Sequence, residues 1–362
     1  MKELNFTKKH TQIAKEVAIL LMLAHHLFAF PARIYVEQGY ISMLSIRGYN
    51  IEYIIGRFGS LCVAIYLFLS GYGIYMIIQK KGIFTLKDAF KRVKNMYINY
   101  WIVFIIFIPL GFIFFNKNFN IREFLLNLVG LSSSYNGEWW FFRLYIELIL
   151  VVPLLKIVVS DNVFKSLINI TGLVILSKVL IIIPSIKYIT SSIIYEDITD
   201  LLYFQGSFCM GYICAKFDIY SEVIKQFIKY KIDNKFIYIL LSISVVVIRC
   251  IIGNRAIIDF ILAPIFIFAM VNMLYNSVVH KLFITLGKHS TNMWLTHSFF
   301  CYTYLQWLVF KPRISILILI FLVILSICSS ILVNYIIKSY NIIVLKLKNR
   351  TGNNIQFKES HL

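Results

Sequence analysis

Charged residues, and acidic ones above all, are scarce in this sequence of 362 residues. They make up 15% of the chain, against about 25% in an average soluble domain. Only 17 residues are acidic and 36 are Lys or Arg, so the formal net charge is +19. Hydrophobic residues make up 59% and the mean hydropathy is +0.78. This composition argues against a disordered tail and a soluble nucleic-acid-binding protein, and predicts an integral membrane protein.

The sequence also lacks the cysteine patterns of disulfide scaffolds and zinc sites. Its six cysteines all fall inside apolar stretches, with no CxxC pair and no Cys/His cluster at zinc spacing. We interpret them as small buried hydrophobic residues. The sequence therefore predicts neither a disulfide framework nor a metal site.

Long apolar segments recur along the chain. A hydrocarbon core about 30 Å thick requires roughly 20 apolar residues per helix. Ten segments meet this requirement: 12–31, 54–79, 97–115, 139–158, 164–184, 199–217, 236–252, 257–275, 291–311 and 314–337. We expect an all-α polytopic membrane bundle of about ten transmembrane helices over residues 1–340, followed by a short basic tail at 341–362. The first segment has no clear small-x-small cleavage site, so we expect it to remain as the first helix.

Lys and Arg are distributed unequally among the connections between these segments. If the N-terminus is cytoplasmic, the inward-facing connections and ends carry 24 of them and the outward-facing connections carry 8. Because Lys and Arg favour the cytoplasmic side, this count predicts that both termini are cytoplasmic. It is typical of a multi-pass protein of the bacterial cytoplasmic membrane.

Several polar residues fall within the apolar segments, where a charge costs at least about 2.5 kcal/mol. A rise of 1.5 Å per residue places seven of them in the outer third of the membrane: His26, Arg57, Arg143, Glu147, Lys178, Arg249 and Asp259. Their common depth favours a polar cavity. Glu147 lies one helical turn from Arg143 and is expected to pair with it. In the alternative interpretation, Arg57 and Arg143 extend to the outer interface while Lys178 and Arg249 pair locally.

The first segment contains a spaced pair of basic residues. Lys15 and His26 are eleven residues apart, which returns to the same helix face within about 20°. A cation at the inner end and an imidazole above it suit a long donor with an anionic head, because neutral His is a general base near pH 7. A Lys at the interface and a satisfied buried His would give the same spacing. His25 points about 100° away from His26, so we expect only one of the two to face a given cavity.

Five short stretches add a family signal. They are Lys15 with His25-His26 in the first segment; Ser70-Gly71-Tyr72 ending the second; Lys91-Arg92-Val93-Lys94 before Tyr100-Trp101; Trp140-Phe141 with Tyr145 and Pro153; and Leu286-Gly287, Ser290 and Trp294-Leu295-Thr296-His297. In this order the chain resembles the membrane acyltransferase family 3 proteins, whose first helix carries Arg or Lys, ten residues and then His. Ile98 and Trp294 depart from the family pattern, where Pro and Tyr are common.

The resemblance implies a ten-helix enzyme that moves an acyl group, usually acetyl from acetyl-CoA, onto a hydroxyl of a cell-surface or exported polysaccharide. It implies that His26 is the catalytic base, that Lys15 helps to bind the donor and that Arg92 meets the CoA phosphates. Acetyl-CoA is then a substrate, and no bound cofactor is expected. The expected partners are acetyl-CoA, a polysaccharide or lipid-linked glycan acceptor and the lipid bilayer, without nucleic acid.

Further roles follow from the expected depths. Ser70, Tyr72 and Arg92 lie near the inner end with Lys15, where a cytoplasmic nucleotide would dock. His297 lies only about 10 Å above the inner face, so we expect it on the donor path rather than beside His26.

At the outer end we expect Arg57 or Arg143 to stabilise the oxyanion, with Glu147 holding Arg143. His25 and Arg249 are expected to contact the acceptor.

Two other functions remain open for this sequence. Polar residues at membrane depth also mark transport paths, so a small-molecule or glycan-intermediate transporter is the alternative to an enzyme. A structural scaffold for a glycan-export complex is the third, and it would tolerate the loss of Lys15 and His26. The acyl group (acetyl or succinyl), a direct or acyl-histidine route, the acceptor sugar and the oligomeric state are left open.

Overall fold

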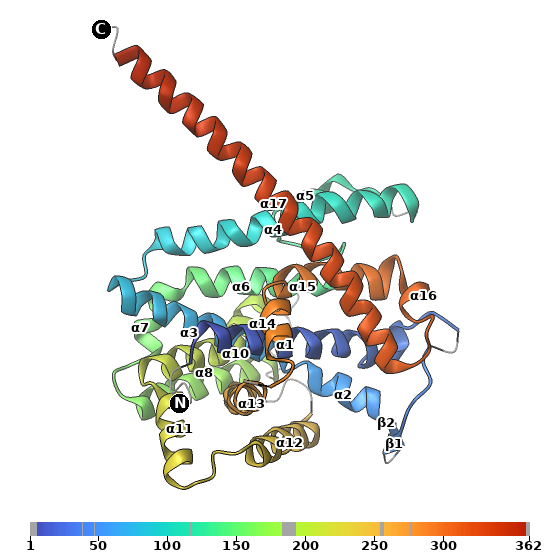
Figure 1. Ribbon diagram of the computed structural model, residues 1–362, viewed down its shortest axis with the longest axis vertical. Coiled ribbons are helices and arrows are strands. Elements are labelled where there is room, and N and C mark those ends of the chain that lie inside the picture. The colour runs from blue at the N-terminus through green and yellow to red at the C-terminus, as the bar shows by residue number, and fades with distance from the viewer. Residues whose placement is uncertain are drawn as a thin grey trace.

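The protein is a bundle of helices, seen in a computed structural model (Figure 1). The structure describes residues 6–37, 39–46, 48–115, 118–182, 193–253, 257–275 and 277–359. The one sheet within these ranges is a two-stranded antiparallel hairpin of β1 (Ser45–Ile46) and β2 (Tyr49–Asn50). The predicted all-α architecture is confirmed.

Each of the ten expected segments coincides with helical structure. The corresponding elements are α1 (Lys8–Phe28); α2 (Ile51–Gly59) with α3 (Cys62–Lys81); α4 (Leu86–Phe114); η2 (Gly137–Trp139) with α6 (Trp140–Leu150), η3 (Val152–Leu154) and α7 (Leu155–Val158); α8 (Val163–Ile182); α10 (Ile193–Lys216); α12 (Lys235–Ile252); α13 (Asp259–Leu274); α15 (Ser290–Ser298) with the π-helical turn η4 (Phe299–Thr303) and α16 (Gln306–Val309); and α17 (Ser315–Glu359).

Five helical stretches in the described part are long and apolar enough to cross a membrane: Ile51–Lys81, Leu86–Phe114, Val163–Ile182, Lys235–Ile252 and Ser315–Ile343. Asp259–Leu274 is a shorter apolar helix. That all ten cross the membrane, and that both termini are cytoplasmic, stay predictions.

Some helices begin earlier than the apolar pattern indicates or lie outside it. α4 begins at Leu86, well before residue 97, because Thr85 and Asp88 form a capping box at its first turn. This early start places Arg92 on a helix rather than in a loop. Three short helices in the connections were not expected from the sequence: α5 (Ile121–Leu128), α11 (Ile219–Lys229) and α14 (His280–Leu286).

Glycines allow the helices around α1 to approach closely. A Cβ atom at Gly71 of α3 would lie 1.8 Å from the carbonyl oxygen of Phe208 in α10, so the two backbones are in contact there. A Cβ atom at Gly59 of α2 would lie 2.3 Å from the carbonyl oxygen of Leu21 in α1. Fourteen of the 21 residues of α1 are buried, and the polar residues among them are His10, Glu16, His25 and His26.

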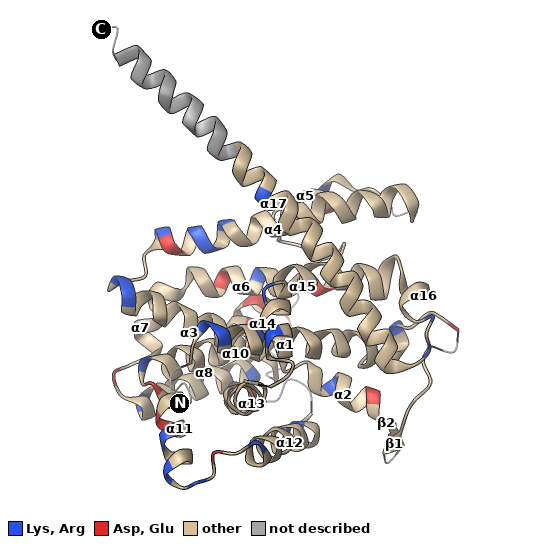
Figure 2. Ribbon diagram, in the orientation of Figure 1, with Lys and Arg blue, Asp and Glu red and all other residues tan. Residues whose placement is uncertain are grey.

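The two ends of the bundle differ in charge. Lys and Arg gather where α3 ends, where α4 begins and around α11 (Figure 2). We call this the basic end. The opposite end, where α1 ends and β1 and β2 lie (Figure 1), is the hairpin end. Glu52 anchors the hairpin to α17 by accepting hydrogen bonds from the backbone N–H of Met43 (2.9 Å) and the hydroxyl of Ser315 (2.9 Å).

Candidate functional site

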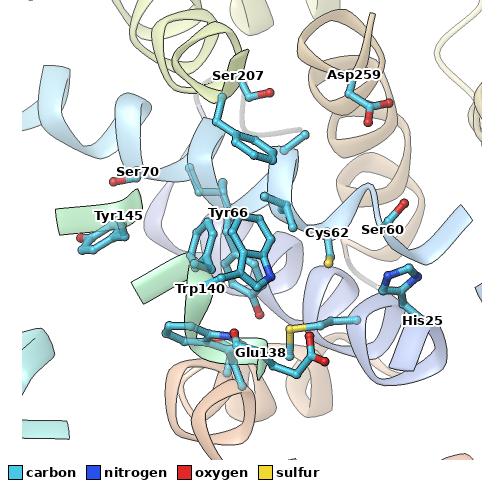
Figure 3. Close-up of a pocket in the computed structure, with 18 of the residues that line it drawn as sticks. His25, Ser60, Cys62, Tyr66, Ser70, Glu138, Trp140, Tyr145, Ser207 and Asp259 are labelled. Carbon is cyan, nitrogen blue, oxygen red and sulfur yellow. The ribbon is translucent and has the colours of Figure 1, made fainter. Parts of the chain in front are cut away.

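A single cavity of about 720 Å³ runs through the bundle between its basic and hairpin ends. Six of the eleven residues to which the sequence analysis assigned a catalytic or binding role line it: Lys15, His25, His26, Ser70, Arg92 and Arg249. Figure 3 shows Ser70 and Tyr145 on one side of this cavity and His25 and Ser60 on the other, with Tyr66 and Trp140 between them. The Lys15–His26 pair therefore faces one continuous space, as its helical spacing indicates.

Two cations without acidic partners lie at the basic end of the cavity. Lys15 of α1 and Arg92 of α4 both line it, close enough for their charges to repel each other. Within the part of the chain that the structure describes, neither forms an ion pair with a carboxylate. Arg92 extends over Gly73, where an added Cβ atom would lie 3.6 Å from Nη2. The hydroxyl of Ser70 is buried and has no hydrogen-bond partner among the described residues. The two cations suit an anionic group of a ligand, and the hydroxyl of Ser70 suits a polar group next to it.

The hairpin end of the cavity contains a His–Glu–Arg group. Oε2 of Glu138 lies 3.3 Å from Nε2 of His26, and Oε1 accepts a hydrogen bond of 2.8 Å from Nη1 of Arg33. The guanidinium of Arg33 lies over the rings of Phe30 (4.6 Å) and Tyr302 (5.1 Å). The hydroxyl of Tyr302 donates to the backbone oxygen of His26 (2.5 Å) and lies 3.4 Å from its Nδ1 atom. His26 is therefore held on two sides.

The turn that carries Glu138 is fixed to α15. Asn136 is the N-cap of η2, and its side chain accepts a hydrogen bond from the backbone N–H of Glu138 (3.1 Å). Nε1 of Trp294 donates to the carbonyl of Glu138 (3.3 Å), and the hydroxyl of Ser298 donates to Asn136 Oδ1 (2.9 Å). Nε1 of Trp139 donates to a backbone carbonyl of α15 (3.1 Å). These bonds keep the carboxylate at a fixed position beside α1.

Two further imidazoles flank His26. The ring centroids of His25 and His297 lie 5.0 Å and 4.9 Å from that of His26. Nδ1 of His25 donates to the carbonyl of Gly56 (2.7 Å) and Nδ1 of His297 donates to the carbonyl of Trp294 (2.7 Å). Nε2 of His297 is buried and has no partner within the described residues.

The positions of His25 and His297 correct two expectations. His297 lies beside His26 rather than apart from it on the donor path. Its depth was counted from residue 291, but the backbone at Gly287 already packs on the carbonyl of Gln12, 2.1 Å from where its Cβ atom would be. The chain is thus inside the bundle before α15 begins. His25 and His26 both line the cavity, although we expected only one to do so, because the cavity extends around the end of α1.

Arg249 forms a buried polar network at the hairpin end. Its side chain is 2% exposed and makes two hydrogen bonds to Asp259, of 3.0 Å and 3.1 Å. Nη2 also donates to the hydroxyl of Ser60 (2.8 Å), and Nη1 donates to the carbonyl of Arg57 (3.0 Å). The guanidinium is therefore paired within the protein and joins α12, α13 and α2 along the cavity wall.

The remaining candidates lie outside the cavity lining. Arg57 extends over the ring of Tyr53 (5.7 Å), and Lys178 over the ring of Tyr203 (4.2 Å). Tyr72 packs on Phe6, with ring centroids 4.9 Å apart.

Arg143 pairs with Glu147 (3.1 Å), which confirms the expected i,i+4 contact, and also with Asp197. Of the seven polar residues expected at one depth, His26, Arg249 and Asp259 line the cavity, and the side chains of the other four do not.

Sequence reasoning missed Glu138 and Arg33. Arg33 was counted only as a charge of an outward-facing connection, and Glu138 was not considered. A usable signal was present, because Glu138 directly precedes the Trp139-Trp140-Phe141 stretch at the edge of an apolar segment. An acidic residue at such an edge is expected to have a partner inside the bundle.

Comparison with known proteins gives one match. A family model described as an acyltransferase domain, acyltransferase 3, covers residues 12–335 of the chain. This range includes Lys15, His26, Arg33, Arg92 and Glu138. No curated protein and no solved structure matches the chain. Because the match extends over most of the sequence, the chain belongs to the acyltransferase 3 family of membrane acyltransferases.

Proposed function

We propose that this protein transfers an acetyl group from acetyl-CoA to a hydroxyl of a cell-surface or exported polysaccharide, at the bacterial cytoplasmic membrane. One observation carries the proposal: a single cavity connects the unpaired cations Lys15 and Arg92 with the imidazole of His26. A CoA thioester has a phosphorylated head and a reactive end separated by a long arm. The cavity offers complementary groups to both.

The basic end suits the head of the donor. Lys and Arg bind phosphates through charge-assisted hydrogen bonds, and Lys15 and Arg92 have no internal anion to compete with the ligand. The free hydroxyl of Ser70 can bond to an amide of the pantetheine arm. Lys15 and His26 are eleven positions apart on α1, a rise of about 16 Å. The arm would follow this face of α1 past Met22, which also lines the cavity.

His26 supplies the base for the transfer. The acceptor oxygen attacks the thioester carbonyl carbon while the imidazole takes the hydroxyl proton. When the intermediate collapses, the C–S bond breaks, the ester remains on the acceptor, and the CoA thiolate takes the proton from the imidazolium.

Arg33 and Arg249 are the arginines that line the hairpin end of the cavity, and the side chain of Arg33 is 46% exposed, so its guanidinium can also donate to the oxyanion. Nε2 of His25 can accept a hydrogen bond from an acceptor hydroxyl, because its Nδ1 carries the hydrogen given to Gly56.

His26→Ala in the full-length purified protein tests the proposal. Radiolabelled acetyl-CoA is supplied with envelope glycans isolated from a strain that lacks the gene, and glycan-bound acetyl is counted. We expect transfer to fall by about 10²–10⁴-fold while acetyl-CoA still binds. The matched control is His289→Ala, because His289 is half-buried, bonds to Ser330 (2.9 Å) and lies outside the lining.

Two outcomes would overturn the proposal. If folded His26→Ala protein still transfers acetyl, His26 is not the base. A folded wild-type protein that neither binds acetyl-CoA nor releases CoA would favour the transporter.

A further inference from the structure

We propose that Glu138 is a positioning residue, which keeps a hydrogen on Nε2 of His26 and leaves the reactive lone pair on Nδ1. The inference rests on the proposed function, because it assigns the atom of His26 that takes the proton. It adds Glu138, and Arg33 behind it, to the residues on which the transfer depends.

The contacts of Glu138 fix where its lone pairs point. The side chain of Glu138 is 9% exposed, and Arg33 donates to Oε1 at 2.8 Å. A carboxylate that accepts a charge-assisted hydrogen bond on one oxygen offers lone pairs, and no hydrogen, at the other. Oε2 faces Nε2 of His26 at 3.3 Å. Two lone pairs would repel each other at this distance, so Nε2 carries the hydrogen.

Tyr302 does not reverse this assignment. Its hydroxyl has one hydrogen, and the backbone oxygen of His26 accepts it at 2.5 Å. Nδ1 lies farther from the same hydroxyl, at 3.4 Å. The imidazole therefore keeps its lone pair at Nδ1.

The flanking histidines have the opposite arrangement. His25 and His297 each donate from Nδ1 to a backbone carbonyl at 2.7 Å, so their lone pairs are on Nε2. Among the described residues, an acidic side chain lies at Nε2 of His26 but not at Nε2 of the other two imidazoles. This contrast gives the inference a spectroscopic signature that a general packing effect would not produce.

The contact between the Glu138 carboxylate and Nε2 of His26 can persist during turnover. When Nδ1 takes the acceptor proton, the imidazolium has its positive charge beside the Glu138 carboxylate, as in the His–carboxylate pairs of hydrolases. Arg33 keeps the carboxylate from rotating, and the carbonyl of Arg33 accepts a hydrogen bond from Gln306 (2.8 Å). Glu138 lines the cavity, but in this role it takes no proton and acts through His26.

Three substitutions at Glu138 separate this role from a structural one. In Glu138→Gln the amide can turn its NH₂ group toward His26 and favour the wrong tautomer. We expect kcat to fall by about 10²–10⁴-fold, in line with other carboxylate–histidine pairs. KM for acetyl-CoA should stay within about twofold. Glu138→Asp keeps the charge and should recover much of the activity. The activity of Glu138→Ala should lie between those of Glu138→Gln and Glu138→Asp.

Glu52→Gln is the matched control. Glu52 is also a buried carboxylate at the hairpin end, but it bonds to Met43 and Ser315 outside the cavity lining.

Nitrogen-15 NMR of histidine-labelled wild-type protein tests the inference without any variant at Glu138. The signals of His26 are identified by their loss in His26→Ala. We expect His26 to show a protonated Nε2 and an unprotonated Nδ1, opposite to His25 and His297. A hydrogen found on Nδ1 of neutral His26 would overturn the inference, and so would Glu138→Gln protein with wild-type kcat.

The proposed function is tested separately by the same series. If wild-type protein transfers acetyl and His26→Ala does not, a negative result at Glu138 removes only the positioning role. If His26→Ala remains active, the proposed base is wrong whatever Glu138 does.

Discussion

The two ends of the cavity hold their charges in opposite ways. At the basic end, Lys15 and Arg92 face the cavity without acidic partners in the described structure. At the hairpin end, Arg33 pairs with Glu138 and Arg249 pairs with Asp259. Two cations without acidic partners can be neutralised by an anionic ligand that enters the cavity. Cations that already form ion pairs within the protein are satisfied and keep their geometry. The basic end is thus suited to bind and the hairpin end to position.

Removing one member of a pair at the hairpin end should have the largest effect. Arg249→Met leaves Asp259 buried without its hydrogen-bonded cation, so we expect a loss of about 3–5 kcal/mol in the free energy of unfolding. A lower thermal midpoint of the purified variant than of wild type, in the same detergent, reports this loss of stability. The double variant Arg249→Met with Asp259→Leu should recover most of the loss, because apolar side chains replace a buried ion pair at little cost. If the single variant is as stable as wild type, the hairpin end is not held by its pairs.

At the basic end we expect an effect on donor binding rather than on folding. Lys15→Gln combined with Arg92→Gln should raise KM for acetyl-CoA by about 100-fold or more, because each hydrogen bond to a charged group contributes about 1.5–3 kcal/mol and the double variant loses at least two of them. Initial-rate kinetics with acetyl-CoA measure it, and acetyl-pantetheine, which lacks the nucleotide phosphates, should show little difference between variant and wild type. Lys94→Gln, an exposed residue on α4 outside the lining, is the control. A loss confined to kcat would contradict an anion site at this end.

The smallest effect is expected outside the cavity. Arg143 pairs with Glu147 and Asp197 away from the lining, so Arg143→Gln should leave kcat within about twofold, since partly exposed pairs contribute about 0–1 kcal/mol. The same acetyl-transfer assay measures it on folded protein. A tenfold loss would instead support the interpretation from sequence, in which Arg143 stabilises the oxyanion.

Features that depend on residues within one helix could be predicted from the sequence, whereas contacts between helices could not. The positions of the ten helical segments, the common face of Lys15 and His26, and the Arg143–Glu147 pair all depend on residues within one helix, and the structure contains each of them. The expected depth of a residue in the membrane did not predict which side chains from different helices meet. Arg57, Lys178 and Arg249 were expected at a similar depth, yet only Arg249 lines the cavity. Depth leaves the rotation of each helix about its own axis undetermined.

By itself the sequence determined that this is a largely helical membrane protein with a basic residue and a histidine on one face of its first helix. Apolar segments long enough to cross a bilayer and a helical period of 3.6 residues are enough for that. Only the tertiary structure decided that Glu138 and His297, more than a hundred residues away in sequence, lie beside His26. Those contacts depend on where glycines such as Gly59 and Gly287 let backbones touch α1, and on the turn fixed to α15, because packing between helices sets their rotation and offset.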